Sequence, residues 1–132
     1  MPMEVSLLEM LEARERRAIR QKVLLSAYGK TMICFTMNIA GPVKNSSLIR
    51  RGYALGKRLL RQQLEVAGIP VAYSEEIQEK SGNEAIFLLD ADPLAVKAIT
   101  VEIEDQPAVG RLFDMDVLCP DGRKVDRQEL GR

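Results

Sequence analysis

The residues best suited to chemistry are two aspartates separated by one residue, Asp114 and Asp116. Residues 113–117, within a strand predicted for residues 111–118, alternate apolar and polar side chains, which puts both carboxylates on one face, about 7 Å apart along the backbone. Carboxylates this close repel each other unless water or a cation screens them. Hard divalent cations such as Mg²⁺ take oxygen ligands and hold substrate phosphates, so the pair indicates phosphoryl or nucleotidyl transfer. Two solvated aspartates on a polar strand face are the plainer interpretation.

The turn after this strand decides whether a third polar residue joins the pair. If Pro120-Asp121-Gly122 is a three-residue loop with its glycine left-handed, Asp126 falls opposite Asp116. A two-residue turn would place Arg127 there instead. Both alternatives stay open, and the plainer interpretation of Asp126 is a surface residue.

A basic cluster lies near the start of a helix predicted for residues 46–67. Lys44 precedes this helix, and Arg50 and Arg51 lie in its first turns. The free N–H groups of a helix N-terminus, together with these cations, favour binding of a phosphate-bearing anion. Three cations further along the helix are more typical of an ordinary solvated face: Lys57, Arg58 and Arg61.

Composition excludes several kinds of chemistry. The 132 residues contain no histidine, which removes Ser-His and Cys-His nucleophile pairs. Cys34 and Cys119 are far apart and lack the spacing of a zinc site, so we expect two reduced thiols in a cytoplasmic protein. Nineteen basic and nineteen acidic residues cancel, which gives no indication of nucleic acid or membrane as partner. The longest uncharged stretch, residues 31–43, is too short to span a bilayer.

Periodicity and capping residues predict the elements that would position these groups. Ser6 and Glu9 form a capping box for a helix to about residue 28, whose charged middle, residues 12–17, indicates a solvated stretch or a break. A second helix, capped by Asn45 or Ser46, is predicted to run to about residue 67, and a third for residues 92–104. Strands are predicted for residues 31–40, 71–78, 84–89 and 111–118, and a final hairpin strand for residues 123–127.

After the first helix, the predicted order is β-α-β-β-α-β, which is typical of a ferredoxin-like sandwich. We therefore expect one α+β domain over residues 1–132, with an N-terminal helix and an extra C-terminal hairpin strand. By analogy with that fold, the strand beginning at Arg111 runs antiparallel beside the first strand. This pairing would bring Gly110 and Arg111 near the loop from Gly41 to Lys44.

Two sequence blocks resemble those of a known enzyme family. The first is residues 38–46, NIAGPVKNS, continuing to Arg50 and Arg51, and the second is residues 110–118, GRLFDMDVL, preceded by residues 102–104, EIE. Together, and over nearly the whole chain, they are similar to the citrate lyase holo-acyl-carrier-protein synthases, which are nucleotidyltransferases.

The resemblance implies transfer of a phosphoribosyl-dephospho-coenzyme A group onto a serine of the acyl carrier (gamma) subunit of citrate lyase. The donor is the triphosphoribosyl-dephospho-coenzyme A precursor, and pyrophosphate leaves. The resemblance also implies Mg²⁺ held by Asp114 and Asp116, with Arg111 beside them as a catalytic residue. The substrate-binding residues that it implies are Gly41, Pro42, Lys44, Arg50, Arg51 and Gly110.

Other functions stay open. The related synthase that modifies the malonate decarboxylase carrier protein has similar chemistry, although the block from Gly41 to Lys44 favours the citrate lyase enzyme. Outside enzymes, the chain would be a non-catalytic module that binds a nucleotide or a carrier protein. Members of the family usually continue into a segment with cysteines and a histidine, which lies outside residues 1–132, so a shortened, inactive relative is a third interpretation.

Overall fold

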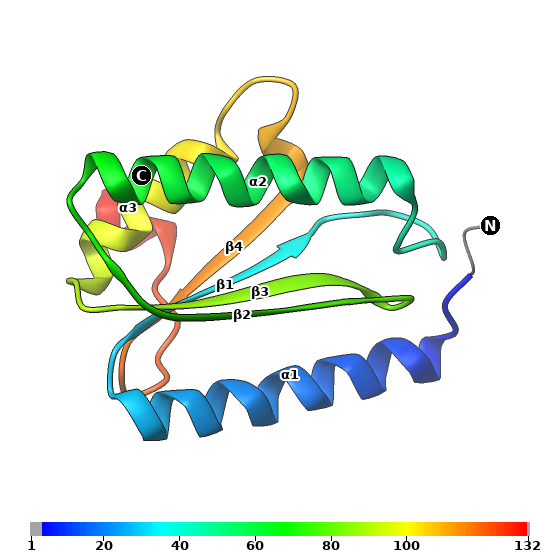
Figure 1. The fold of residues 1–132 in the computed structure, drawn as a ribbon, viewed down its shortest axis with the longest axis horizontal. Coiled ribbons are helices and arrows are strands. Elements are labelled where there is room, and N and C mark those ends of the chain that lie inside the picture. Colours follow the sequence, from blue (N-terminus) through cyan, green and yellow to red (C-terminus); the bar gives the residue numbers. More distant parts are fainter. Residues whose placement is uncertain (1–3, 132) are drawn as a thin grey trace.

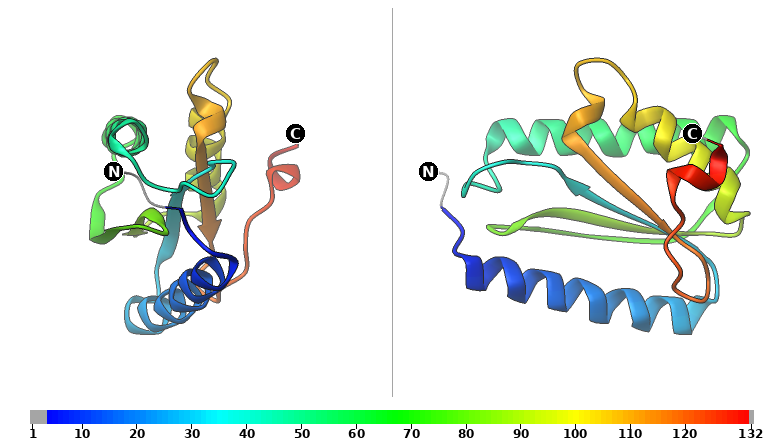
Figure 2. Two further views of the ribbon diagram at one scale, coloured as in Figure 1. Left: turned by 90° about the vertical axis from the view of Figure 1, so that its right-hand side faces the viewer. Right: turned by 180° about the vertical axis from the view of Figure 1, so that it is seen from behind.

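A computed structural model describes residues 4–131 as an antiparallel four-stranded sheet with helices on both faces (Figure 1). The strand order is β2-β3-β1-β4. Helix α1 covers one face, and α2 and α3 cover the other (Figure 2). None of the helices in this described part has the length and hydrophobicity to cross a membrane. In chain order the elements are α1 (Leu7–Tyr28), β1 (Thr31–Met37), α2 (Ser47–Val66), β2 (Val71–Glu79), β3 (Gly82–Leu89), α3 (Pro93–Glu104), η1 (Gly110–Leu112), β4 (Phe113–Leu118) and η2 (Arg127–Leu130).

The larger hydrophobic core lies between the sheet and the α2–α3 layer. Phe35 of β1 is its centre, stacked on Tyr53 of α2 at 5.3 Å and edge-on to Phe113 of β4 at 5.7 Å. Helix α2 comes this close because residue 56 is glycine, where a Cβ would lie 2.4 Å from the Phe35 ring. Alternate residues of β4 point into this core, so the residues between them must face α1.

The sheet face under α1 is apolar at one end and polar at the other. Near the C-terminal end of α1, Leu24 and Leu25 pack in a second cluster with five sheet residues, Met32, Cys34, Ile86, Leu88 and Leu118. Towards the N-terminal end of α1, three strands present Glu84, Thr36 and Asp114 as direct neighbours. Helix α1 is therefore anchored by apolar contacts at one end and lies over polar side chains at the other.

Ion pairs attach the polar half of α1 to the β2–β3 hairpin. These are Arg16–Glu79 (2.6 Å), Arg17–Glu84 (2.9 Å), Arg20–Glu75 (2.6 Å) and Glu9–Lys80 (2.7 Å). The helix starts at the predicted capping box of Ser6 and Glu9 and ends at Gly29, whose φ is 62°. It runs without a break through residues 12–17, so of our two expectations the solvated stretch is the correct one.

Differences from the predicted boundaries are largest where β1 meets β4. Strand β1 ends at Met37 rather than at residue 40, because Asn38 turns towards the start of β4. Its backbone N–H donates to the Leu112 carbonyl oxygen at 2.8 Å, and its Nδ2 donates to that of Arg111 at 3.2 Å. Strand β4 begins at Phe113 rather than at Arg111, because η1 occupies the preceding three residues.

The predicted hairpin strand, residues 123–127, does not form as a regular strand. The turn is the three-residue alternative, with Gly122 left-handed at φ 93°, and it leads to an isolated bridge between Leu118 and Lys124. The Asp126 N–H then donates to the Glu129 carboxylate at 2.8 Å, at the start of η2. This turn into η2 ends the pairing before Asp126 reaches the position opposite Asp116.

Candidate functional site

Asp114 and Asp116 share the face of β4 that is turned towards α1. Their partners in β1 are Thr36 and Cys34, and the intervening Met115 is buried in the opposite core. Asp114 is exposed and Asp116 is partly exposed. Partial burial of the carboxyl group, together with the neighbouring Asp116 carboxylate, raises the pKa of Asp114 above its usual value. The strand alternation thus places two mutually repelling carboxylates side by side.

Lys124, which the sequence did not single out, contacts this pair. Its Nζ lies 3.2 Å from Asp116 Oδ1, and the charge of Asp116 raises the pKa of Lys124. Lys124 lies there because the three-residue turn pairs it with Leu118 at the end of β4. The turn residues were a usable signal, since the register that they set decides which side chains lie beside the strand.

The pair fits a magnesium ion that shares its coordination with substrate phosphates. Two neighbouring carboxylates, one with a raised pKa, form an environment that a divalent cation stabilises. Within residues 4–131, no group of three histidine, cysteine or acidic side chains is arranged to hold a metal. Asp126 therefore supplies no third ligand. Mg²⁺ commonly binds through one or two carboxylates, water and phosphate, so two protein ligands are sufficient.

The loop between β1 and α2 is held close to the site by contacts from distant segments. The side-chain amides of Asn45 and buried Asn83 exchange two hydrogen bonds of 3.1 Å. The Pro42 carbonyl accepts a bond from the Val5 N–H at 2.7 Å. At the end of the loop, Ser46 caps α2 by accepting from the Ile49 N–H. The loop is thus tied to β3 and to the residues before α1.

Lys44 of this loop and Asp114 meet in one pocket under α1. The pocket has a volume of about 180 Å³ and lies between α1, the β2–β3 hairpin and the ends of β1 and β4. Lys44 Nζ donates to the Ile39 carbonyl oxygen at 2.5 Å. The pocket thus combines a carboxylate and an ammonium from two of the sequence blocks.

The other predicted cations lie outside this pocket. Arg50 and Arg51 are exposed in the first turns of α2, on the opposite face of the sheet. Arg111 is exposed in η1, three residues before Asp114, and its carbonyl oxygen accepts from Asn38. Helix α2 begins at the same end of the sheet as the β2–β3 hairpin that borders the pocket (Figure 1). Arg111 adjoins the pocket through Asn38, which lines it.

The predicted glycines differ in what they do. Gly41 is exposed and left-handed, with φ 85°, and it precedes exposed Pro42 in the loop. Gly110 is buried, and a Cβ there would lie 2.2 Å from the Glu104 carbonyl oxygen. Glu104 itself accepts from the Met115 N–H at 2.8 Å, on the free edge of β4. The close packing of η1 against the end of α3 therefore explains why residue 110 is a glycine.

Known relatives place the chain in a class of enzymes. The family model described as apo-citrate lyase phosphoribosyl-dephospho-CoA transferase matches residues 5–132. A protein of that name from Citrobacter koseri is 34% identical over 126 residues, which are 96% of this chain and 69% of the relative. Its counterpart from Escherichia coli O139:H28 is 32% identical over 125 residues, 95% of this chain and 68% of the relative.

The chain is therefore related to transferases over almost its whole length, as the two sequence blocks indicated. It belongs to the apo-citrate lyase phosphoribosyl-dephospho-CoA transferase family. It spans about two thirds of the length of the two relatives described above.

Proposed function

We propose that this protein attaches the phosphoribosyl-dephospho-coenzyme A prosthetic group to a serine of the citrate lyase acyl carrier (gamma) subunit. The donor is triphosphoribosyl-dephospho-coenzyme A. The observation that carries the proposal is the pocket that joins Lys44 to Asp114, in a chain that belongs to the apo-citrate lyase transferase family. The carboxylate and the ammonium suit a substrate whose reacting part is a chain of phosphates.

The reaction is a displacement at phosphorus. A bond forms between the serine oxygen of the carrier and the donor phosphorus that becomes the phosphodiester, and the bond from that phosphorus to the pyrophosphate breaks. The serine proton is released to a base, and pyrophosphate leaves. Because the nucleophile belongs to the carrier, the transferase needs no nucleophile of its own, which agrees with a chain that contains no histidine.

Each proposed residue then has a task in handling negative charge. Asp114 and Asp116 would hold Mg²⁺, which when bound stabilises charge on the phosphate oxygens. Lys44, which lines the pocket, would contact the donor phosphates. Three exposed arginines outside the pocket would favour approach of the phosphates and offset the charge of the leaving pyrophosphate: Arg50, Arg51 and Arg111.

The loop and the turn that flank the site complete the proposed binding surface. Gly41 and Pro42 form the exposed part of the loop, and we propose that they contact the donor. Gly110 sets the path of η1 by its close approach to Glu104, so its contribution to substrate binding acts through the position of Arg111.

We further propose that the sheet and its two packed helices are a ferredoxin-like sandwich, preceded by α1. The strand order β2-β3-β1-β4 and the crossovers α2 and α3 on one face support this classification. A single domain over residues 1–132 and a cytoplasmic location stay predictions.

A transfer assay tests the proposed function. The protein is incubated with the apo acyl carrier subunit, triphosphoribosyl-dephospho-coenzyme A and Mg²⁺, and the carrier is analysed by intact-mass spectrometry. We expect a mass gain equal to one phosphoribosyl-dephospho-coenzyme A group, which EDTA prevents. A folded protein that modifies the malonate decarboxylase carrier instead, or binds the donor without releasing pyrophosphate, would contradict the proposal.

A further inference from the structure

The pocket under α1 contains an arginine that the proposed function has not used. Arg14 of α1 lines it, together with Arg17 of the same helix and Lys44 of the loop. Two carboxylates line it as well, Glu84 and Asp114. Three cations therefore face two anions, which leaves the lining with a net positive charge and favours an anionic ligand.

The charges within the pocket are not equally available. Arg17 Nε donates to Glu84 Oε2 at 2.9 Å, and both side chains are largely buried, so these two charges neutralise each other. Lys44 Nζ donates to a neutral carbonyl oxygen, that of Ile39. A neutral partner leaves the lysine charge uncompensated. The cationic capacity of the pocket thus rests on Lys44 and Arg14.

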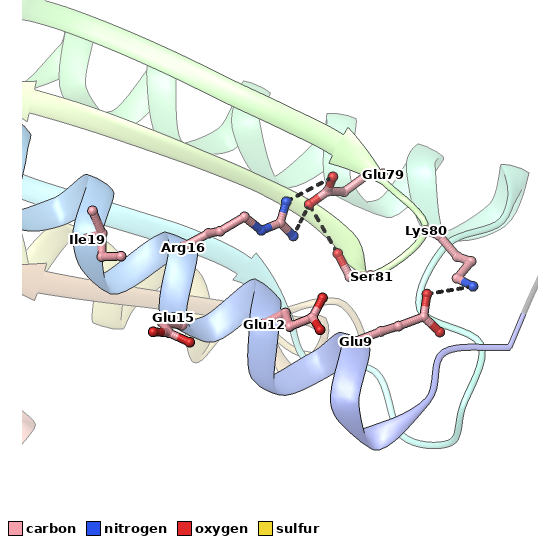
Figure 3. A pocket seen from close by; sticks show the side chains of 8 residues that line it. All are labelled: Glu9, Glu12, Glu15, Arg16, Ile19, Glu79, Lys80 and Ser81. Carbon is pink, nitrogen blue, oxygen red and sulfur yellow. Dashed lines mark hydrogen bonds and ion pairs between the residues drawn. The ribbon is translucent and has the colours of Figure 1, made fainter.

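Arg14 differs from the neighbouring arginines of α1. Arg16 pairs with Glu79 of β2, as Figure 3 shows, and Arg17 and Arg20 pair with Glu84 and Glu75. In residues 4–131, Arg14 makes neither an ion pair nor a hydrogen bond with another side chain, although it belongs to the same helix. Its guanidinium has five N–H donors free to bind phosphate oxygens.

The size of the pocket limits the ligand that fits. Its volume of about 180 Å³ is below the roughly 300–1,000 Å³ typical of pockets that enclose a drug-sized molecule. A phosphate chain is narrow and highly charged, whereas a nucleotide would need a larger, more apolar site. Asp114 lines the same pocket, so a phosphate held there would lie beside the aspartate pair.

From these contacts we infer that Arg14 and Lys44 form a polyphosphate subsite that binds the pyrophosphate end of the donor, with α1 as one wall of the active site. This inference rests on the proposed function for the identity of the donor. The subsite itself recognises linked phosphates through charge-assisted hydrogen bonds from one guanidinium and one ammonium group.

Isothermal titration with inorganic tripolyphosphate tests the subsite without the transfer reaction. We expect Arg14→Gln to raise the Kd about tenfold, the change produced by losing one charge-assisted hydrogen bond. Arg16→Gln is the matched control, because Arg16 lies two residues away and outside the pocket, in an ion pair with Glu79. Its Kd should stay within about twofold of the wild-type value. Equal affinities for Arg14→Gln and the wild type, with both folded by circular dichroism, would overturn the inference.

Steady-state transfer then separates this inference from the proposed function. With Arg14→Gln, the KM for the donor should rise about tenfold while kcat changes little, since the phosphates are bound in both ground state and transition state. Wild-type protein that binds tripolyphosphate through Arg14 but performs no transfer would support the subsite and contradict the proposed function. If the wild type transfers the group and Arg14→Gln leaves the KM for the donor unchanged, the proposed function would be supported and the subsite contradicted.

Discussion

At the scale of single residues, the site is a set of charges arranged by strand alternation and by one turn. Asp114 and Asp116 lie on one face because successive side chains of a strand point to opposite sides. Lys124 joins Asp116 through the register set by the Gly122 turn. One carboxylate of the pair thus has a protein cation beside it at 3.2 Å, while Asp114 lines the pocket where phosphate would bind.

Cys34 lies across from Asp116, but its thiol is predicted to be unreactive in the folded protein. It is 5% exposed, and burial raises its pKa from 9.0 to about 12. Because the thiolate is the nucleophile, alkylation by iodoacetamide at pH 8 should be about a hundredfold or more slower than for an ordinary cysteine. Peptide mapping after timed labelling measures Cys34 separately from Cys119.

Labelling in a denaturant is the control for this prediction. Cys34 should react at the rate of an exposed thiol once the protein is unfolded, because the burial that raises its pKa is lost. Rapid modification of Cys34 in the folded protein would contradict the packing of β1 against α1.

At the scale of elements, α1 is attached to the sheet differently from α2 and α3. The other two helices cover the larger hydrophobic core, whereas α1 has apolar anchors at its C-terminal end and ion pairs along the rest. If α1 forms one wall of the active site, this arrangement keeps that wall polar where the donor binds. The attachment of α1 to the β2–β3 hairpin should therefore weaken at low pH, because protonation of the glutamates removes these ion pairs.

Glu75 provides the test of that dependence. It accepts two hydrogen bonds from Arg20, at 2.6 and 2.7 Å, and one from Tyr73, and the Arg20 contact is the main cause of its lowered pKa. A carboxyl group whose pKa is lower in the folded protein than in the unfolded chain stabilises the fold at pH values above its unfolded pKa of about 4.5. This stabilisation is lost as the pH falls through the pKa of the folded state. Glu75→Gln should therefore have a lower unfolding free energy than the wild type at pH 7, and this difference in unfolding free energy should become smaller below pH 4.5.

Urea unfolding at several pH values measures this gap. The control is Glu102→Gln, which changes an exposed glutamate on α3 and should change the unfolding free energy at pH 7 by no more than about 0.5 kcal/mol. A gap for Glu75→Gln that stays constant from pH 7 to pH 3 would contradict the role assigned to its ion pair.

Gly110 also acts at the scale of elements, because it allows the chain between α3 and β4 to pack closely against the end of α3. A Cβ at this position would meet the Glu104 carbonyl at 2.2 Å, so Gly110→Ala must displace backbone and should lower the unfolding free energy by about 1–3 kcal/mol. Urea denaturation measures the loss, with Arg111→Gln at the exposed neighbouring position as control. Unchanged stability together with lost transfer would show that Gly110 acts only through substrate.

At the scale of the whole molecule, local sequence signals were enough for the order of the three helices and four strands up to residue 118, and for the aspartate pair. The caps at Ser6 and Ser46, the glycine stop at Gly29 and the alternation around Asp114 act over a few residues, and each is visible in the sequence. Pairing of β1 with β4, expected from fold analogy, is confirmed by the register of Thr36 with Asp114.

What the sequence did not predict depends on contacts between distant segments. Nothing local indicates that α1 lies across the polar end of the sheet, because its ion pairs join residues 55 to 71 positions apart. The pocket that contains Arg14 follows from that placement and was missed for the same reason. The prediction of a C-terminal strand was wrong because η2, which begins with the hydrogen bond from the Asp126 N–H to Glu129, competes with continued pairing to β4.

The central claim is that transfer takes place at the aspartate pair beside the pocket under α1. The most direct test compares single-turnover transfer rates, with intact-mass detection of the carrier, for wild type, Asp114→Asn and the exposed control Asp90→Asn. We predict a loss of at least about a hundredfold for Asp114→Asn, the scale of removing one preorganised electrostatic contact, and no loss for Asp90→Asn. Neither variant should have a lower unfolding midpoint than the wild type, because the raised pKa of Asp114 shows that its charge does not stabilise the fold. A folded Asp114→Asn protein that transfers the group at the wild-type rate would contradict the claim.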